Sequence, residues 1–129
     1  MAAVITNTGI AAVASRINGA DAEAAFTYIA TGTGTTGADV LDTIMETEIT
    51  DSGLQRAAGT CTRVTTTLTN DTAQVVKSFA VTGPYTVSEV GLFNAAAVGV
   101  ILVHDVFTGL PLVSTDTFVV TMKVKVEAA

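Results

Sequence analysis

Near its carboxyl end the chain reads Phe118-Val119-Val120-Thr121-Met122-Lys123-Val124-Lys125-Val126. All five even-numbered residues of this run are apolar, whereas both lysines stand at odd-numbered positions. Successive side chains of a β-strand point to opposite faces of the sheet. The alternation therefore predicts a strand with its even-numbered residues in the core and its lysines in water, as antiparallel sheets allow.

Working outward from this strand, the rest of the chain also favours β-structure. It contains 23 Thr, 18 Val and 20 Ala, and its hydrophobic and charged fractions are 49% and 14%. Thr and Val are β-branched and favour pleated surfaces. Five further strands are predicted, at residues 26–30, 63–69, 72–81, 87–93 and 100–107. Asn70-Asp71 suits a tight hairpin turn between two of them.

Two helices are expected in the first half of the chain. Ile10, Val13, Ala14 and Ile17 share one helical face, which predicts a helix over 8–18. It begins after a polar capping residue among positions 6–8 and ends before Gly19. The spacing of apolar residues at 41, 44 and 45 predicts a second, short helix near 39–47.

These elements indicate a mainly β fold: an antiparallel β-sandwich or barrel-like domain with one N-terminal helix and a short second helix. A length of 129 residues suits one domain, so residues 1–129 are interpreted as a single domain. Residues 1–7 are interpreted as an N-terminal arm. The candidate interaction residues are those of the apolar start of that arm: Met1, Ala2, Ala3, Val4, Ile5 and Thr6.

Composition argues against several functions. The net charge is -6 with only 6 basic residues, so no phosphate-binding footprint for nucleic acid is present. One Cys and one His do not suffice for a zinc site of the usual type, and we expect no metal and no cofactor. No apolar run approaches the roughly 20 residues of a membrane-spanning helix, and the N-terminus lacks the basic residues of a signal peptide.

The glycine-rich segment from Gly32 to Gly37 is the first candidate site. It matches G-x-G-x-x-G after a predicted strand, but no Lys follows it, and the chain beyond lacks the βαβ pattern of a dinucleotide site. A mobile loop is therefore favoured over a nucleotide cradle.

Three other features are candidates for chemistry. His104 precedes Asp105 in a predicted strand, where neighbours point to opposite faces, so a surface or interface histidine is favoured over a catalytic dyad. Cys61 has no histidine near it in sequence and is interpreted as a small buried or half-buried hydrophobe. Acidic residues at 39, 42, 46 and 48 do not follow a calcium-loop pattern and are interpreted as a solvated acidic face. No catalytic residue is assigned, and the chain is not expected to be an enzyme.

Three short segments, taken in order, resemble a known family. They are Thr6-Asn7-Thr8-Gly9, then Ile29-Ala30-Thr31-Gly32-Thr33-Gly34, then Ser88-Glu89-Val90-Gly91-Leu92-Phe93-Asn94-Ala95. They are similar to the T-N-x-G helix, the IAxGxG strand and the EhGLF(D/N)A strand (h, apolar) of the N-terminal domain of bacteriophage tail-collar fibre proteins. Residues 47–58 also look like a segment common in small phage virion proteins.

The resemblance implies a non-enzymatic virion structural protein, assembled in the host cytoplasm. Collar-fibre domains precede long fibre sequences, whereas this chain stops at Ala129, which favours a capsid decoration (cement) protein that binds the assembled shell. The alternative is a tail-fibre, neck or baseplate adaptor. The expected partners are the major capsid protein or tail and neck proteins, together with further copies of this chain. A third interpretation, from another class, is a small ligand-binding or enzymatic domain that uses the Gly32–Gly37 loop.

Overall fold

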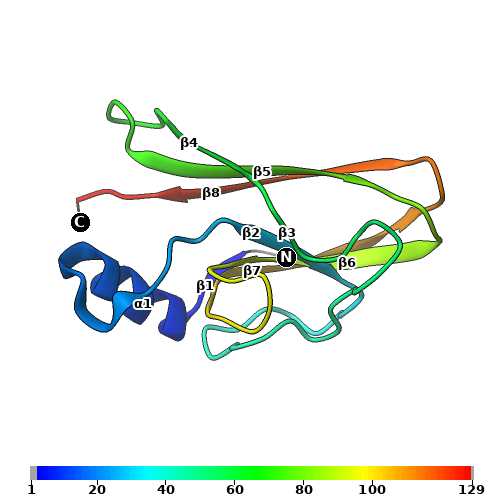
Figure 1. Ribbon diagram of the computed structural model, residues 1–129, viewed down its shortest axis with the longest axis horizontal. Helices are drawn as coiled ribbons and strands as arrows, with labels where there is room; N and C mark the ends of the chain where they lie inside the picture. Colours follow the sequence, from blue (N-terminus) through cyan, green and yellow to red (C-terminus); the bar gives the residue numbers. More distant parts are fainter. Residues whose placement is uncertain (1–2, 129) are drawn as a thin grey trace.

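The computed structural model describes residues 3–128 and shows two antiparallel sheets facing each other (Figure 1). The five-stranded sheet has the order β1 (Val4–Ile5), β7 (Ile101–Leu112), β6 (Tyr85–Phe93), β2 (Tyr28–Gly32) and β3 (Ala57–Ala58). The three-stranded sheet has the order β4 (Thr60–Val64), β5 (Thr72–Ala80) and β8 (Thr117–Lys125). The predicted mainly β, antiparallel fold with one N-terminal helix is confirmed.

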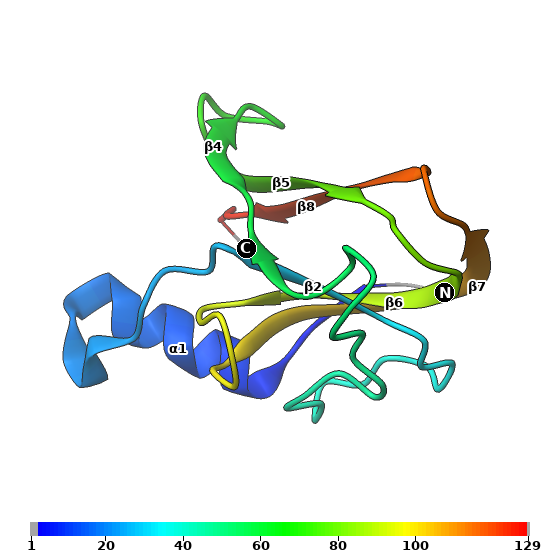
Figure 2. The same cartoon turned by 45° about the vertical axis from the view of Figure 1, so that its right-hand side comes forward.

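Apolar residues of both sheets form the main core between them. β6 contributes Val90 and Leu92, β5 contributes Phe79, and β8 contributes Val120 and Met122. Three short connections, β3 to β4, β5 to β6 and β7 to β8, cross from one sheet to the other, the first of which is clear in Figure 2. The alternating pattern that predicted β8 therefore places Val120 and Met122 in the core as expected, although Val126 lies beyond the strand and is 72% exposed.

A second apolar cluster lies on the outer face of the five-stranded sheet, which faces away from the three-stranded sheet. It consists of Ala30, Met45, Phe93 and Ile101. Figure 2 shows helix α1 (Asn7–Asn18) and the long loop after β2 on this side of the molecule. Because β6 is covered on both faces, seven of its nine residues are buried in an unbroken run, as its burial pattern records.

Helix α1 begins and ends where the sequence predicts. The Thr6 side chain accepts a hydrogen bond from the Gly9 N–H, and Gly19 closes the helix in the left-handed conformation at φ 76°. The helix nevertheless presents its small residues, not its apolar stripe, to β7. A Cβ on Gly9 would lie 2.6 Å from the Leu102 Cα, whereas Ile17 is 82% exposed.

The second predicted helix is absent from the described residues: 39–47 forms turns and bends, and the only other helical element is the 3-10 turn η1 (Ala20–Ala22). Two backbone donors that this helix would bond internally are taken by a distant side chain. The Glu46 and Thr47 N–H groups donate to the Glu89 carboxylate at 3.0 and 2.7 Å. The bounds of the strand predicted at 63–69 are also wrong, because β4 begins at Thr60 and ends at Val64.

The expected N-terminal arm differs in the structure. Val4 and Ile5 pair with His104 and Val103 of β7, and Thr6 is fully buried. The Thr6 hydroxyl donates to the Ile101 carbonyl oxygen at 2.6 Å, because the cap of α1 sits directly on β7. Of the residues proposed for interaction, Ala3 and Ile5 are exposed, while Met1 and Ala2 lie outside the described residues.

Candidate functional site

The most unusual side chain of the structure is the carboxylate of Glu89, which is fully buried in the middle of β6. It lies opposite Gly32 of β2 and Val106 of β7, next to a register shift between Val87 and Glu89. An ionised carboxylate in such a place is costly unless hydrogen bonds satisfy its oxygens. Glu89 is therefore the point from which the site is described.

Three backbone N–H groups of the loop after β2 donate to this carboxylate. Gly34 and Thr47 donate to Oε2 at 2.8 and 2.7 Å, and Glu46 donates to Oε1 at 3.0 Å. The Ser88 hydroxyl donates to the Gly34 carbonyl oxygen at 2.6 Å beside them. The loop thus wraps around one side chain of β6.

Glycine is required where the loop approaches Glu89. A Cβ built on Gly32 would lie 2.5 Å from the Glu89 Oε2, and one on Gly34 would lie 2.4 Å from the same atom. Both glycines belong to the G-x-G-x-x-G match, so the close approach to a carboxylate explains the first two glycines without any nucleotide. Gly37 has open space around its Cα.

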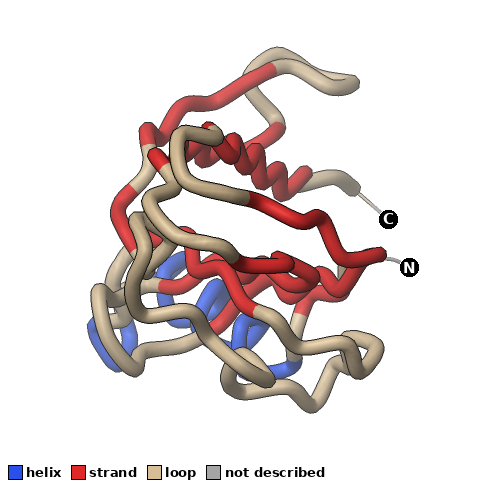
Figure 3. Tube along the Cα trace, turned by 90° about the vertical axis from the view of Figure 1, so that its right-hand side faces the viewer, coloured by secondary structure: helices blue, strands red, loops and turns tan. Residues whose placement is uncertain are grey.

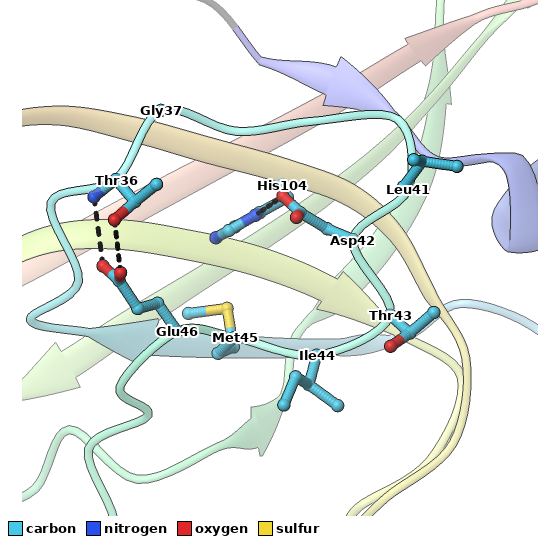
Figure 4. A pocket seen from close by; sticks show the side chains of 9 residues that line it. All are labelled: Thr36, Gly37, Leu41, Asp42, Thr43, Ile44, Met45, Glu46 and His104. Carbon is cyan, nitrogen blue, oxygen red and sulfur yellow. Dashed lines mark hydrogen bonds and ion pairs between the residues drawn. The ribbon is translucent and has the colours of Figure 1, made fainter.

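His104 completes the site and links Glu89 to the tip of the loop. Its Nε2 lies 2.8 Å from the Glu89 Oε1, and its Nδ1 lies 2.6 Å from the Asp42 Oδ2. Figure 4 shows the His104–Asp42 contact at the floor of the hollow. We call this row of three residues, Asp42, His104 and Glu89, the clamp. The expectation of a surface histidine is wrong, because His104 is 3% exposed and faces the loop.

Electrostatics favour the charged forms of His104 and Glu89 in the clamp. The hydrogen bond that His104 donates to Glu89 raises the pKa of His104 above 6.5 against the opposing effect of burial, and Asp42 adds to the increase. Burial raises the pKa of Glu89, but hydrogen bonds from His104 and from Thr47, Glu46 and Gly34 outweigh it and lower the pKa to about 2. These shifts favour the imidazolium form of His104 beside the ionised Glu89.

A second carboxylate holds two more amides of the glycine-rich segment. Glu46 accepts from the Thr35 N–H at 2.6 Å and from the Thr36 N–H at 3.0 Å, and also from the Thr36 hydroxyl (Figure 4). These bonds lower the pKa of Glu46. The amides that would cradle a phosphate thus already bind carboxylates of the chain, which argues against a phosphate site. The segment predicted as a mobile loop is tied to β6 and to itself.

The other acidic residues of this region also have specific partners. Glu48 forms a two-pronged ion pair with Arg56, at 2.7 and 3.0 Å. The Arg56 guanidinium lies 3.6 Å from the centroid of the Phe93 ring and donates to the Val98 carbonyl oxygen at 2.8 Å. The interpretation of this segment as a solvated acidic face is thus wrong for Asp42 and Glu48, which are half-buried in ion pairs.

A hollow of about 310 Å³ lies above the clamp, with the apolar side chains of Leu41, Ile44 and Met45 around it (Figure 4). Both nitrogens of His104 already bind carboxylates, so the imidazole offers no free nitrogen as a general base. Cys61 is exposed on β4 of the other sheet, contrary to the expectation of a buried or half-buried thiol. These hydrogen bonds and ion pairs hold the loop after β2 in place.

Within residues 3–128, no cluster of three or more His, Cys, Asp or Glu side chains is arranged to hold a metal ion. Over the same residues, no helix has the length and apolar character needed to cross a bilayer. Comparison of the chain with protein-family models, with curated proteins and with solved structures finds no match.

No local sequence pattern joins His104, Asp42 and the glycines, which lie on separate elements. Glu89 lies in one of the segments that resemble tail-collar domains, and no role is predicted for it from the sequence. One signal marks Glu89: an acidic residue inside a mostly apolar strand, Val87 to Phe93, is expected to be paired when that strand is central in a sheet.

Proposed function

We propose that this chain is a non-enzymatic structural protein of a bacteriophage virion, specifically a capsid decoration protein that binds the assembled shell. The observation that carries the proposal is that the three segments resembling tail-collar domains form one connected unit. Thr6 caps α1 and binds β7, Gly34 binds Glu89, and Glu89 binds His104 of β7. The resembling residues are thus those that fix the five-stranded sheet and its loop, which supports a shared architecture.

The clamp also supports a role in attachment. It holds a loop whose tip presents Leu41 and Ile44 to solvent, at 74% and 72% exposure. Side chains of this kind, held on a fixed backbone, lose little conformational entropy when a partner covers them. The loop tip is therefore our candidate for contact with a virion subunit, in addition to the predicted N-terminal residues 1–6.

The first experiment locates the protein in intact particles of the phage that encodes it. Cys61 is the only cysteine and is exposed, so a maleimide-gold label marks one position, with Cys61→Ser as the unlabelled control. Label distributed over the shell, in numbers comparable with the shell subunits, agrees with decoration. Label confined to the tail or neck supports the second candidate, an adaptor protein, which is favoured by the resemblance itself. Absence of label from particles overturns both.

The second experiment tests the surface. The double variant Leu41→Asp, Ile44→Asp is expected to fold as the wild type does and to lose binding to particles that lack the protein. The matched control is Leu68→Asp, an equally exposed apolar position, at 67%, in the turn after β4. Unchanged binding by the folded double variant would exclude the loop tip as the contact surface.

A further inference from the structure

β8 has a free edge along its whole length. All nine of its residues, Thr117–Lys125, pair with β5 on one side, and the strand is the last of the three-stranded sheet. Within residues 3–128 no strand follows β8 in this sheet. Figure 3 shows the strand that leads to the C-terminus in the upper part of the molecule, away from the helix. A free edge carries a row of backbone N–H and C=O groups that are ready to pair with another strand.

The other sheet margins offer much less. β1 and β3 have two residues each, β4 has five, and the part of β7 beyond its pairing with β1 contains Gly109 and Pro111. Short strands and prolines are the usual means by which proteins prevent edge pairing. β8 contains neither glycine nor proline, and its only charged side chains are Lys123 and Lys125, so among the described strands it is the long edge that neither shortness nor proline protects.

The hydrogen bonds at both ends of β8 show which of its residues face outward. The Asp116 carbonyl oxygen accepts from the Val81 N–H, and the Val126 N–H donates to the Asp71 carbonyl oxygen. Both bonds point toward the β5 side and involve even-numbered positions. In an antiparallel ladder the bonding side alternates from residue to residue, so the backbone groups of the odd-numbered residues face outward.

We propose that β8 pairs antiparallel with β8 of a second copy of this chain, about a two-fold axis at Thr121, to form a dimer with one continuous six-stranded sheet. In this register Thr121 pairs with the partner's Thr121, Val119 with the partner's Lys123, and Thr117 with the partner's Lys125. Every one of these residues has its backbone groups facing outward, so each opposed pair exchanges both hydrogen bonds.

Strand length and charge together favour this register: axes at Val119 or Val120 also separate the lysines but leave Lys125 opposite a residue outside β8, whereas the axis at Thr121 pairs the strand over its full length. No lysine lies opposite or diagonal to a lysine, whereas an axis at Met122 sets Lys123 diagonal to the partner's Lys123, and an axis at Lys123 sets the two directly opposite. On the inner face the half-buried Phe118 meets the partner's Val124, which is also half-buried in the monomer. The dimer thus extends the apolar row of the core across the axis.

The dimer concerns two copies of this chain alone, so its test is independent of the proposed virion role. Sedimentation of the purified protein across the micromolar to millimolar range is expected to show a monomer–dimer equilibrium. Thr121→Pro removes an outward N–H and is expected to weaken the dimer by about tenfold or more, whereas Thr121→Val, which keeps the N–H, does not. Circular dichroism checks that both variants fold.

A cross-link tests the register even if the proline variant fails to fold. In a Cys61→Ser background, Thr121→Cys is expected to form a disulfide-linked dimer under mild oxidation, because opposed Cα atoms lie within disulfide reach. Lys125→Cys is the matched control and is expected to remain unlinked, since its own counterpart lies across from Thr117. A monomer at millimolar concentration, or linkage through position 125 in preference to 121, overturns the proposal.

Discussion

Replacing Glu89 with glutamine tests the clamp most directly, because the change keeps the shape of the side chain and removes its charge. One carboxylate oxygen becomes an NH₂ group that faces N–H donors from the loop or from His104. Two hydrogen bonds to a charged acceptor are thus lost at a fully buried position. A buried donor left without an acceptor is more costly than an exposed one.

The size of the effect follows from the pKa of Glu89. Its fall from 4.5 to about 2 means that the fold favours the ionised carboxylate over the neutral acid by about 3 kcal/mol. Adding the unfavourable contact between donors gives an expected loss of roughly 3–5 kcal/mol in the free energy of unfolding. For a domain of this size that corresponds to a melting temperature lower by roughly 10–20 °C.

The assay is thermal and urea unfolding at pH 6, followed by circular dichroism, with Glu127→Gln as the exposed matched control. The control is expected to stay within about 0.5 kcal/mol of the wild type. Because the folded-state pKa of Glu89 is lowered, its contribution is present above pH 4.5 and is lost as the pH falls toward 2. A Glu89→Gln variant that melts within about 2 °C of the wild type would show that the carboxylate does not hold the loop.

Three further predictions concern the titration of the clamp and the two apolar clusters. His104 is the only histidine, so its imidazole NMR signal should titrate with a midpoint above 6.5, and Asp42→Asn should lower that midpoint. Because the pKa of His104 is raised in the folded state, its stabilisation is present below pH 6.5 and is lost as the pH rises through the folded-state pKa. An unshifted midpoint in the wild type would contradict the ion pairs. Gly91→Val should lower the free energy of unfolding by about 1–3 kcal/mol despite the β-propensity of Val. Even a Cβ at position 91 would lie 2.8 Å from the Met45 sulfur and 3.0 Å from the Ile101 Cδ1. A melting temperature equal to or above that of the wild type would refute the close contact. Val120→Asp should unfold the domain, since it buries a charge without a partner, whereas Val126→Asp should leave the midpoint of urea unfolding nearly unchanged. Similar urea midpoints for the two variants would mean that the register of β8 is wrong.

The clamp makes the loop after β2 part of the fold even though it has no regular secondary structure. Its backbone donors bind Glu89 and Glu46, and its Met45 side chain belongs to the outer apolar cluster. Between pH 4.5 and 6.5 both Glu89 and His104 contribute fully, because the first is lost only toward acid and the second only toward base. We therefore expect the loop to be most firmly held in that interval.

The sequence predicted the elements that depend on short-range patterns. The even-numbered apolar residues of β8 identified both the strand and its buried face, and the capping residues around Thr6 and Gly19 identified the ends of α1. In these cases residues within a few positions of one another carry the signal, through the two-residue period of a strand or the orphan N–H groups of a helix end. No partner from elsewhere in the chain is needed to predict them.

The tertiary structure alone decided the rest, because distant residues competed with local patterns and prevailed. The apolar spacing at 41, 44 and 45 predicted a helix, but the N–H groups of Glu46 and Thr47 bind Glu89, which is more than forty residues away in sequence. The apolar stripe of α1 faces solvent because Gly9 allows a closer approach to β7 than its isoleucines would. A buried charge such as that of Glu89 is stable only with its donors in place, and those donors become its neighbours only when the sheets have assembled.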